Sequence, residues 1–197
     1  MKFSDCKKLI LEDLGRLADT RRKMILSALF NDTAKVAVLF RLGTYLQDAP
    51  IYLLLAKAIN SLLLRHYRYK TGIQLVPGTQ IKGGVKFVHF GSIVINRGVV
   101  IGRNSTIYHD VTIGAALYNN APVARIGKNV VICAGAKIIG DVTIGDNVII
   151  AANAVVTHDV PSGCIVGGIP AKILSTTAED KARLWLKIRC NDNVIKQ

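Results

Sequence analysis

A six-residue repeat runs through the second half of the chain, where residues Ile126 to Val156 read IGKNVVICAGAKIIGDVTIGDNVIIAANAVV. Every sixth residue of this stretch is an isoleucine, except for the valine at its end. This spacing matches neither the 3.6-residue period of a helix nor the alternation of a half-buried strand. A six-residue apolar period is typical of hexapeptide repeats, in which each hexad forms one short strand and a bend.

The same register reaches further toward the N-terminus in two earlier blocks. Their members are Ile95, Ile101, Ile107 and Ile113, preceded by Leu75, Ile81 and Phe87. Three hexads form one triangular coil, and β-branched side chains suit the inner surface of a prism built from such coils. Successive coils stack at the ordinary strand spacing of about 4.8 Å. We therefore predict a mainly β protein, whose parallel β-helix occupies residues 71–175.

Two interruptions break this register. Two residues are inserted at Val88-His89-Phe90-Gly91, and a longer insertion separates Ile113 from Ile126. The longer insertion predicts a loop, residues 115–125, extruded from one corner of the prism. Repeats are usually interrupted for function, and loops on a rigid scaffold often carry binding residues. The two interruptions are therefore where we expect a functional site.

Helical patterns flank the repeat. Residues 1–70 are predicted to be a helical region, with helices over residues 3–29, 34–46 and 51–67. Residues 176–197 are predicted to hold a short amphipathic helix and a basic tail. The helix over residues 51–67 is unusually apolar but too short to span a membrane. We expect it to be buried against a neighbouring chain or the β-helix, and the alternative is contact of residues 51–70 with a membrane surface.

The formal net charge of this 197-residue chain is +13, and its basic residues are spread over the whole sequence. Aromatic residues make up only 6%, so the stacking platforms that bind nucleic acid are scarce and no nucleic-acid partner is expected. The charge favours an anionic partner, such as a phosphorylated cofactor, a membrane surface or an acidic glycan. A solvated basic surface without a partner is the alternative.

The cysteines give no sign of a metal site. Cys6, Cys133, Cys164 and Cys190 show no metal-ligand spacing, so we expect reduced thiols and no metal. The N-terminus lacks the apolar core and cleavage site of a signal peptide. We therefore expect a cytoplasmic protein, with peripheral attachment to the inner face of the membrane as the alternative.

Several stretches together resemble the hexapeptide-repeat acyltransferases, and within them the serine acetyltransferase group. They are residues 40–43 (FRLG), 88–95 (VHFGSIVI), 111–114 (VTIG), 134–138 (AGAKI) and 168–172 (GIPAK). The resemblance implies a left-handed β-helix and a homotrimer, or a dimer of trimers, with active sites between neighbouring subunits. It also implies acetyl-CoA as the co-substrate.

This resemblance assigns His89 as the general base that takes the proton of an acceptor hydroxyl, a role that suits an imidazole at neutral pH. The backbone N–H groups of Gly114 and Ala115 fall where the family stabilises the developing oxyanion. The residues implied to contact the cofactor are Ala134, Ala152, Thr157, His158 and Lys172. The small side chains of Ala134 and Ala152 leave room for the pantetheine arm, and Lys172 suits the nucleotide phosphates. The alternative role of the two alanines is plain packing between coils.

Three positions depart from the serine acetyltransferase pattern. Gln74 stands where the family has the aspartate that orients the catalytic histidine, and Val88 and Val123 replace an aspartate and a histidine used in amino-acid recognition. A glutamine carbonyl can accept the Nδ1–H of the imidazole, but it brings no negative charge. These departures argue against free serine as the acceptor.

A second branch of the family accommodates these departures. The chain also resembles the exopolysaccharide O-acetyltransferases of the colanic acid biosynthesis type, through Ile93-Val94-Ile95-Asn96 and through His109, which lies just before the VTIG stretch. We expect His109 to line the acceptor pocket or to assist catalysis. An exposed histidine at a coil corner is the alternative.

The favoured function is therefore an acetyl-CoA-dependent O-acetyltransferase with His89 as its base. Its expected acceptor is a sugar of a capsular polysaccharide or exopolysaccharide, or the precursor of that sugar. Serine O-acetylation in cysteine biosynthesis is the first alternative. The second is an inactive trimeric β-helix scaffold, which the missing carboxylate at Gln74 favours.

Overall fold

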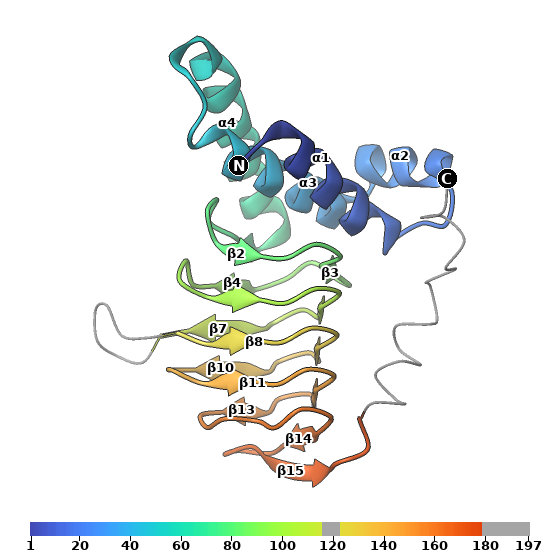
Figure 1. The fold of residues 1–197 in the computed structure, drawn as a ribbon, viewed down its shortest axis with the longest axis vertical. Helices are drawn as coiled ribbons and strands as arrows, with labels where there is room; N and C mark the ends of the chain where they lie inside the picture. The colour runs from blue at the N-terminus through green and yellow to red at the C-terminus, as the bar shows by residue number, and fades with distance from the viewer. Residues whose placement is uncertain (116–122, 179–197) are drawn as a thin grey trace.

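The computed structural model describes residues 1–115 and 123–178 and shows a triangular β-helix capped by helices at one end (Figure 1). The helices come first in the chain and lie above the first coil, and the coils then succeed one another down the prism. The prediction of a mainly β fold with an N-terminal helical region is confirmed.

The N-terminal helices differ from the prediction in one respect. They are α1 (Phe3–Gly15), α2 (Arg21–Phe30), α3 (Asp32–Leu46), the 3-10 turn η1 (Ile51–Leu53) and α4 (Leu54–Thr71). The single helix predicted over residues 3–29 is wrong, because the chain turns between α1 and α2. There the hydroxyl of Thr20 caps α2 by accepting a hydrogen bond from the backbone N–H of Lys23 (3.4 Å).

Short parallel strands form the three faces of the prism. The first sheet contains β1 (Ile73–Gln74), β4 (Ile93–Ile95), β7 (Thr112–Gly114), β10 (Lys137–Ile139) and β13 (Val155–Val156). The second sheet contains β2 (Gln80–Ile81), β5 (Val100–Ile101), β8 (Arg125–Ile126) and β11 (Thr143–Ile144). The third sheet contains β3 (Lys86–Phe87), β6 (Thr106–Ile107), β9 (Val131–Ile132), β12 (Ile149–Ile150), β14 (Ile165–Gly167) and the antiparallel β15 (Lys172–Ser175).

The strand pairing confirms the register predicted from the repeat. In the first sheet, Ile113 pairs with Ile95 on one side and with Ile138 on the other. All ten register positions from Ile95 to Val156 are buried, and none is more than 4% exposed. The isoleucines therefore form columns inside the prism. Because each coil is held by this core, the position of every bend along the axis of the prism is fixed.

One corner of the prism leaves no room for a side chain. A Cβ atom added to Gly102 would lie 2.4 Å from the backbone carbonyl group of Gly127 in the next coil. The two backbones are held together, because Gly102 N donates a hydrogen bond of 2.8 Å to the carbonyl oxygen of Ile126. The coils must therefore separate locally to accept any larger residue at this position.

Replacing Gly102 with alanine is expected to destabilise the fold by about 1–3 kcal/mol, the usual cost of overpacking. The measurement is the free energy of unfolding from urea denaturation. Gly15→Ala is the control, since an added Cβ there meets nothing within 4 Å and alanine favours the helix. We expect its stability to be unchanged or slightly higher, and equal destabilisation by both substitutions would contradict the close-packing argument.

A buried ion pair fastens the helices to the first coils. The carboxylate of Asp13 in α1 accepts hydrogen bonds from the guanidinium of Arg41 in α3 (2.8 Å) and from the backbone N–H groups of Gly84 and Val85 (2.8 and 3.0 Å). Both charged side chains are only 3% exposed. Burial raises the pKa of Asp13, while Arg41 and the two N–H groups act in the opposite direction.

Two arginines extend this attachment over successive coils. Arg41 also donates to the carbonyl oxygens of Ile81 and Lys82, and Arg16 donates to that of Asn104 in the next coil. α1 and α3 are thus held in a set position on the prism. As a result, α2 and α3 lie next to the bend that follows β3 (Figure 1).

Some expectations concern residues outside the described ranges. Residues 116–122 cover most of the predicted extruded loop, and residues 179–197 cover most of the predicted C-terminal helix. The division of the chain at residues 70 and 175 stays a prediction. Among the helices of the described ranges, none combines the length and the apolar character needed to cross a bilayer.

Candidate active site

His89 lies on the bend after β3, where the sequence inserts two residues into the repeat, and it is exposed. A hydrogen bond from Gly91 N to the carbonyl oxygen of Thr71 (2.7 Å) holds this bend. Gly91 and Ser92 turn the chain with φ angles of 125° and 36°, in the region that glycine tolerates best. The insertion therefore widens the bend and leaves the imidazole outside the core.

His109 occupies the corresponding bend one coil further along, after β6. The two bends are stacked, because Asp110 N donates a hydrogen bond of 3.0 Å to the carbonyl oxygen of Gly91. The rings of His89 and His109 meet edge to face, with their centroids 5.7 Å apart and an interplanar angle of 67°. The ring of Tyr108 lies 6.2 Å from that of His89. The structure thus brings both predicted histidines together, and their roles stay predictions.

The neighbouring Cys133 and Tyr108 are unsuited to proton exchange at neutral pH. Burial raises the pKa of the Cys133 thiol. The pKa of Tyr108 is also raised, mainly by burial and to a smaller extent by the charge of the nearby Cys133. Cys6, Cys133 and Cys164 are free cysteines. Within the described ranges, no group of three His, Cys, Asp or Glu side chains gathers that could hold a metal ion. The two histidines are therefore the groups at this place that suit acid–base chemistry.

The bends between the third and first sheets form one edge of the prism, which we call the histidine edge. It consists of residues 89–92, 109–110, 134–135 and 152–153. Gly135 N donates to the carbonyl oxygen of His109 (3.1 Å), and Asn153 N donates to that of Ala134 (2.9 Å). Ala134 and Ala152 therefore lie in line with the histidines, and no large side chain projects at either position.

The other predicted residues lie on a different edge, between the first and second sheets, which we call the loop edge. It consists of residues 114–115, 140–141 and 157–158. Gly140 N donates to the carbonyl oxygen of Gly114 (3.0 Å), and a hydrogen bond of 3.0 Å joins the Thr157 hydroxyl to His158 Nδ1. Lys172 is exposed at the start of β15, near the end of the prism.

β7 separates the two edges. A strand rises about 3.3 Å per residue, so the segment from His109 to Gly114 places the edges about 16 Å apart. A base and the oxyanion donors must both lie within about 3 Å of the reacting atoms. One chain alone therefore does not bring His89 and the N–H groups of Gly114 and Ala115 to the same carbonyl.

The three departures from the family pattern have different surroundings. Gln74 lies in β1 opposite Val94, with its side chain on the outer face of the first sheet. Both Gln74 and His89 belong to the described ranges, and no hydrogen bond joins them. The orienting role of Gln74 therefore stays a prediction. Val88 lines the pocket beside His89, and Val123 packs against the core.

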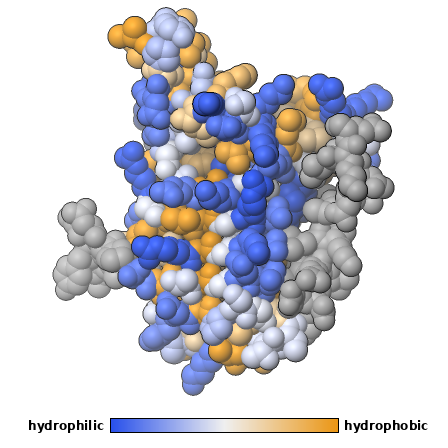
Figure 2. Space-filling view, in the orientation of Figure 1, coloured by the Kyte–Doolittle hydropathy of each residue, from blue (hydrophilic) through white to orange (hydrophobic). Residues whose placement is uncertain are grey.

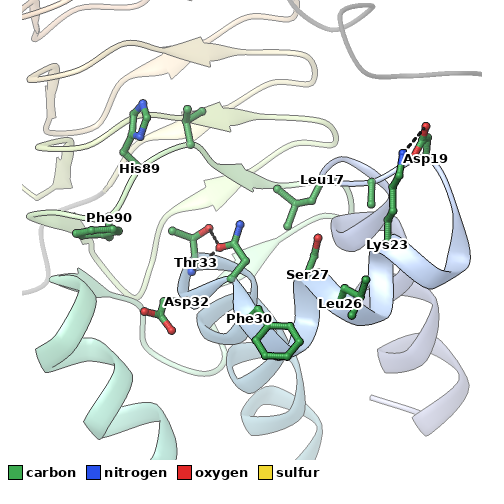
Figure 3. Close-up of a pocket in the computed structure, with 13 residues that line it drawn as sticks. Leu17, Asp19, Lys23, Leu26, Ser27, Phe30, Asp32, Thr33, His89 and Phe90 are labelled. Carbon is green, nitrogen blue, oxygen red and sulfur yellow. Dashed lines mark hydrogen bonds and ion pairs between the residues drawn. The ribbon is translucent and has the colours of Figure 1, made fainter.

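A pocket of about 1050 Å³ lies between the bend of His89 and the helices α2 and α3 (Figure 3). Its helical wall, which we call the charged wall, carries Asp19, Lys23 and Asp32 among apolar and uncharged polar side chains. Lys23 Nζ lies 3.0 Å from the carboxylate of Asp19, and Asp32 pairs with Lys70 at 2.8 Å. Figure 3 shows His89 on one side of this space and the Asp19–Lys23 pair on the other.

Both acids of this wall are ionised at neutral pH. The hydrogen bond from Lys23 lowers the pKa of Asp19, and the hydrogen bond from Lys70 lowers that of Asp32. The family pattern does not predict this wall, because its amino-acid recognition positions, Val88 and Val123, fall on the coils and the loop. The sequence did carry one signal of the wall, the charged segment 19–23. This segment lies in the turn before α2 and in its first residues, within the single helix predicted over residues 3–29.

The stacked hexads and the family match to residues 124–158 define a transferase of the hexapeptide-repeat class. The family description "bacterial transferase hexapeptide (six repeats)" matches residues 124–158. The fold is similar to that of Neisseria gonorrhoeae serine acetyltransferase in complex with serine, with a TM-score of 0.72, 26% identity, and coverage of 88% of this chain and 70% of that chain. This similarity confirms the left-handed β-helix.

Curated relatives define the family more closely. A Helicobacter pylori serine acetyltransferase is 36% identical over 137 residues, which are 69% of this chain and 77% of that protein. A Synechocystis serine acetyltransferase is 44% identical over 113 residues, which are 57% of this chain and 45% of that protein. The chain belongs to the serine acetyltransferase family. It spans about half the length of several curated relatives that it matches.

These relatives correct the predicted acceptor. The expectation of a capsular or exopolysaccharide sugar is wrong, because the relatives point to the first alternative, serine. The special similarity to colanic acid enzymes is likewise unsupported. The error came from treating Gln74, Val88 and Val123 as the whole recognition set. The charged wall, from the turn before α2 and from α2 and α3, lies in the same pocket as His89 and supplies further polar groups.

Proposed function

We propose that the chain transfers the acetyl group of acetyl-CoA to the hydroxyl of L-serine. One observation carries this proposal: the imidazole of His89 lines the same pocket as the Asp19–Lys23 ion pair. Family membership supports the same acceptor, because the relatives are named serine acetyltransferases and the gonococcal protein was solved with serine.

The charged wall matches the chemistry of a free amino acid. Serine carries an ammonium and a carboxylate beside its hydroxyl, and each group needs a partner of opposite charge. Asp19 suits the ammonium and Lys23 suits the carboxylate. Their mutual bond is an exposed ion pair of low energy, so an incoming zwitterion replaces it with two ion pairs at little cost.

The proposed chemistry is direct transfer. His89 takes the proton of the serine hydroxyl while the oxygen attacks the acetyl carbonyl carbon. The carbon–sulfur bond then breaks, the acetyl group stays on the serine oxygen, and the leaving thiolate receives the proton from the imidazolium. We assign His109 as the group that positions the His89 ring, since the two rings meet edge to face.

A second copy of the chain is part of this proposal. The N–H groups of Gly114 and Ala115 lie on the loop edge, away from His89, so the loop edge of a neighbouring subunit must supply the oxyanion donors. A homotrimer provides this arrangement at each seam, and a dimer of trimers repeats it. Sedimentation equilibrium should give three or six times the chain mass of 21.4 kDa, and a monomer would exclude this site.

The cofactor is proposed to lie where the two edges meet. Ala134 and Ala152 leave space for a pantetheine arm along the histidine edge, and Thr157 and His158 approach from the loop edge of the neighbour. Lys172 is exposed beyond them and suits the nucleotide phosphates.

The direct test follows release of the CoA thiol with acetyl-CoA and L-serine. We expect turnover of about 1–1000 per second, the ordinary range for enzymes. N-acetylserine lacks the ammonium and serinamide lacks the carboxylate, so both should react at least about tenfold less efficiently. No turnover of L-serine would overturn the function, and equal turnover of all three acceptors would remove the charged wall from the proposal.

Replacing Asp19 with asparagine is expected to lower kcat/KM for L-serine about 10- to 100-fold, mainly through KM. The reason is the loss of a charged partner for the ammonium. KM for acetyl-CoA should not change. The control is Asp146→Asn, a partly exposed carboxylate paired with Lys128 at a corner away from both edges. A loss that affects both substrates equally would contradict the role of Asp19.

A further inference from the structure

α4 presents apolar side chains on the face turned away from the rest of the chain. Its inner side packs on α3, where Asn60 donates a hydrogen bond to the carbonyl oxygen of Leu39 (3.2 Å). On the opposite side, Leu55 and Leu62 are 73% and 67% exposed, and Ile59 lies between them. The spacing of four and then three residues places these three side chains on one helical face. A helix that contacts only its own chain normally has polar residues there.

The apolar surface continues onto η1, the turn that precedes α4. Ile51 and Tyr52 are 86% and 80% exposed, and Leu54 at the start of α4 is exposed as well. This end of α4 projects beyond the other helices, at the opposite end of the molecule from β15 (Figure 1). Figure 2 shows hydrophobic surface at the same tip. These side chains therefore remain uncovered by the β-helix.

The charges around this surface have a single sign. Residues 49–71 contain no aspartate or glutamate, and their basic residues are Lys57, Arg65, Arg68 and Lys70. Arg65 is exposed, and its guanidinium lies 5.9 Å from the ring centre of Tyr69. Lys57 instead donates a hydrogen bond of 3.2 Å to the carbonyl oxygen of Gln47 at the end of α3. The nearby carboxylates are already engaged, since Asp32 pairs with Lys70 and Asp48 pairs with the N-terminal amino group.

These features distinguish between two occupants, a second copy of the chain and a lipid surface. A second copy docked through the same face would bring a second Arg65 and no carboxylate from residues 49–71. An anionic lipid surface supplies the opposite charge and accepts apolar side chains at its acyl boundary. Moreover, Ile51 and Tyr52 extend beyond the helical face, which suits insertion of a tip and adds nothing to helix pairing.

We propose that η1 and α4 bind the surface of an anionic membrane. Ile51, Leu55 and Leu62 enter the boundary between head groups and acyl chains, and Arg65, on the flank of that face, extends to the lipid phosphates. The helix lies on the membrane without spanning it. This inference is independent of the proposed function, because none of these residues lines the pocket of His89.

The test is flotation of the full chain with vesicles of phosphatidylcholine alone or with about 30% phosphatidylglycerol. We expect at least about tenfold stronger binding to the anionic vesicles, decreasing with added salt. Arg65→Gln should lower this preference about fivefold, whereas Lys57→Gln should leave it nearly unchanged, because Lys57 lies on the other side of α4 and bonds the carbonyl oxygen of Gln47. Equal binding to both kinds of vesicle, or no binding to either, would overturn the proposal.

The apolar part of the surface needs its own variants. Leu55→Ser/Leu62→Ser is expected to weaken binding to anionic vesicles about 100-fold, since each buried leucine contributes roughly a factor of ten or more. Leu174→Ser is the matched control, because Leu174 is 65% exposed on β15 at the far end and should not affect binding. Circular dichroism should show all variants folded. If the double variant reduced the assembly mass and left vesicle binding unchanged, the face would join copies of the chain and the proposal would be wrong.

Discussion

Replacing His89 with alanine is expected to lower kcat for acetyl transfer about 100- to 10,000-fold, the contribution of a positioned general base. The side chain is exposed on a bend outside the isoleucine core, so the fold loses no packing. KM for acetyl-CoA and the unfolding temperature should therefore stay the same. The measurement is steady-state kinetics with L-serine, together with a thermal melt.

Two further histidine variants sharpen this test. His66→Ala is the matched control, because His66 is exposed on α4 and contacts Tyr67, away from the pocket. His109→Ala should lower kcat less than His89→Ala, since the proposed role of His109 is to position the ring and not to take the proton. Full activity in His89→Ala would remove the base assignment. A native chain that neither bound CoA nor acetylated serine would favour the inactive scaffold.

Replacing Asp13 with alanine is expected to destabilise the protein by about 3–5 kcal/mol, the cost of leaving a buried charge without its partner. The variant keeps the Arg41 guanidinium in a site that is 3% exposed and leaves the N–H groups of Gly84 and Val85 without an acceptor. The free energy of unfolding from urea denaturation measures the effect.

The control for this substitution is an ion pair on the surface. Arg125 and Asp141 lie 3.2 Å apart and are both exposed, so Asp141→Ala should cost less than about 1 kcal/mol. Asp13→Asn should fall between the two, because the amide oxygen retains one acceptor. If Asp13→Ala and Asp141→Ala lowered the free energy of unfolding equally, the buried ion pair would not be responsible for holding the helices on the coils.

Local spacing was enough to predict the β-helix. Each hexad places one isoleucine at the same point of a short strand, and burying that residue requires the next coil to repeat the geometry. The register from Ile95 to Val156 was therefore readable without any knowledge of distant contacts. The same reasoning placed His89 at an irregularity of the repeat. His109 was singled out only by the resemblance to exopolysaccharide O-acetyltransferases, and the structure brings the two rings together.

The helical region was less predictable. Apolar spacing indicated helices, but the turn at Thr20 between α1 and α2 depends on one side-chain cap, which a continuous helical pattern conceals. The exposed face of α4 was also uncertain, because an apolar helix has the same sequence pattern whether its outer side is buried or exposed. Only the packing on α3 showed which side of α4 remains free.

The six-residue period alone determined the prism, its core and the edges that carry the predicted residues, because these depend on contacts between successive coils. The pocket is different: it joins Asp19 and Lys23, near the N-terminus, to His89 on the prism. Their separation depends on how α1 and α3 dock, through Asp13, Arg41 and the coil backbone. No periodicity in the sequence predicts that docking, so the charged wall that we propose to bind serine emerged only from tertiary structure.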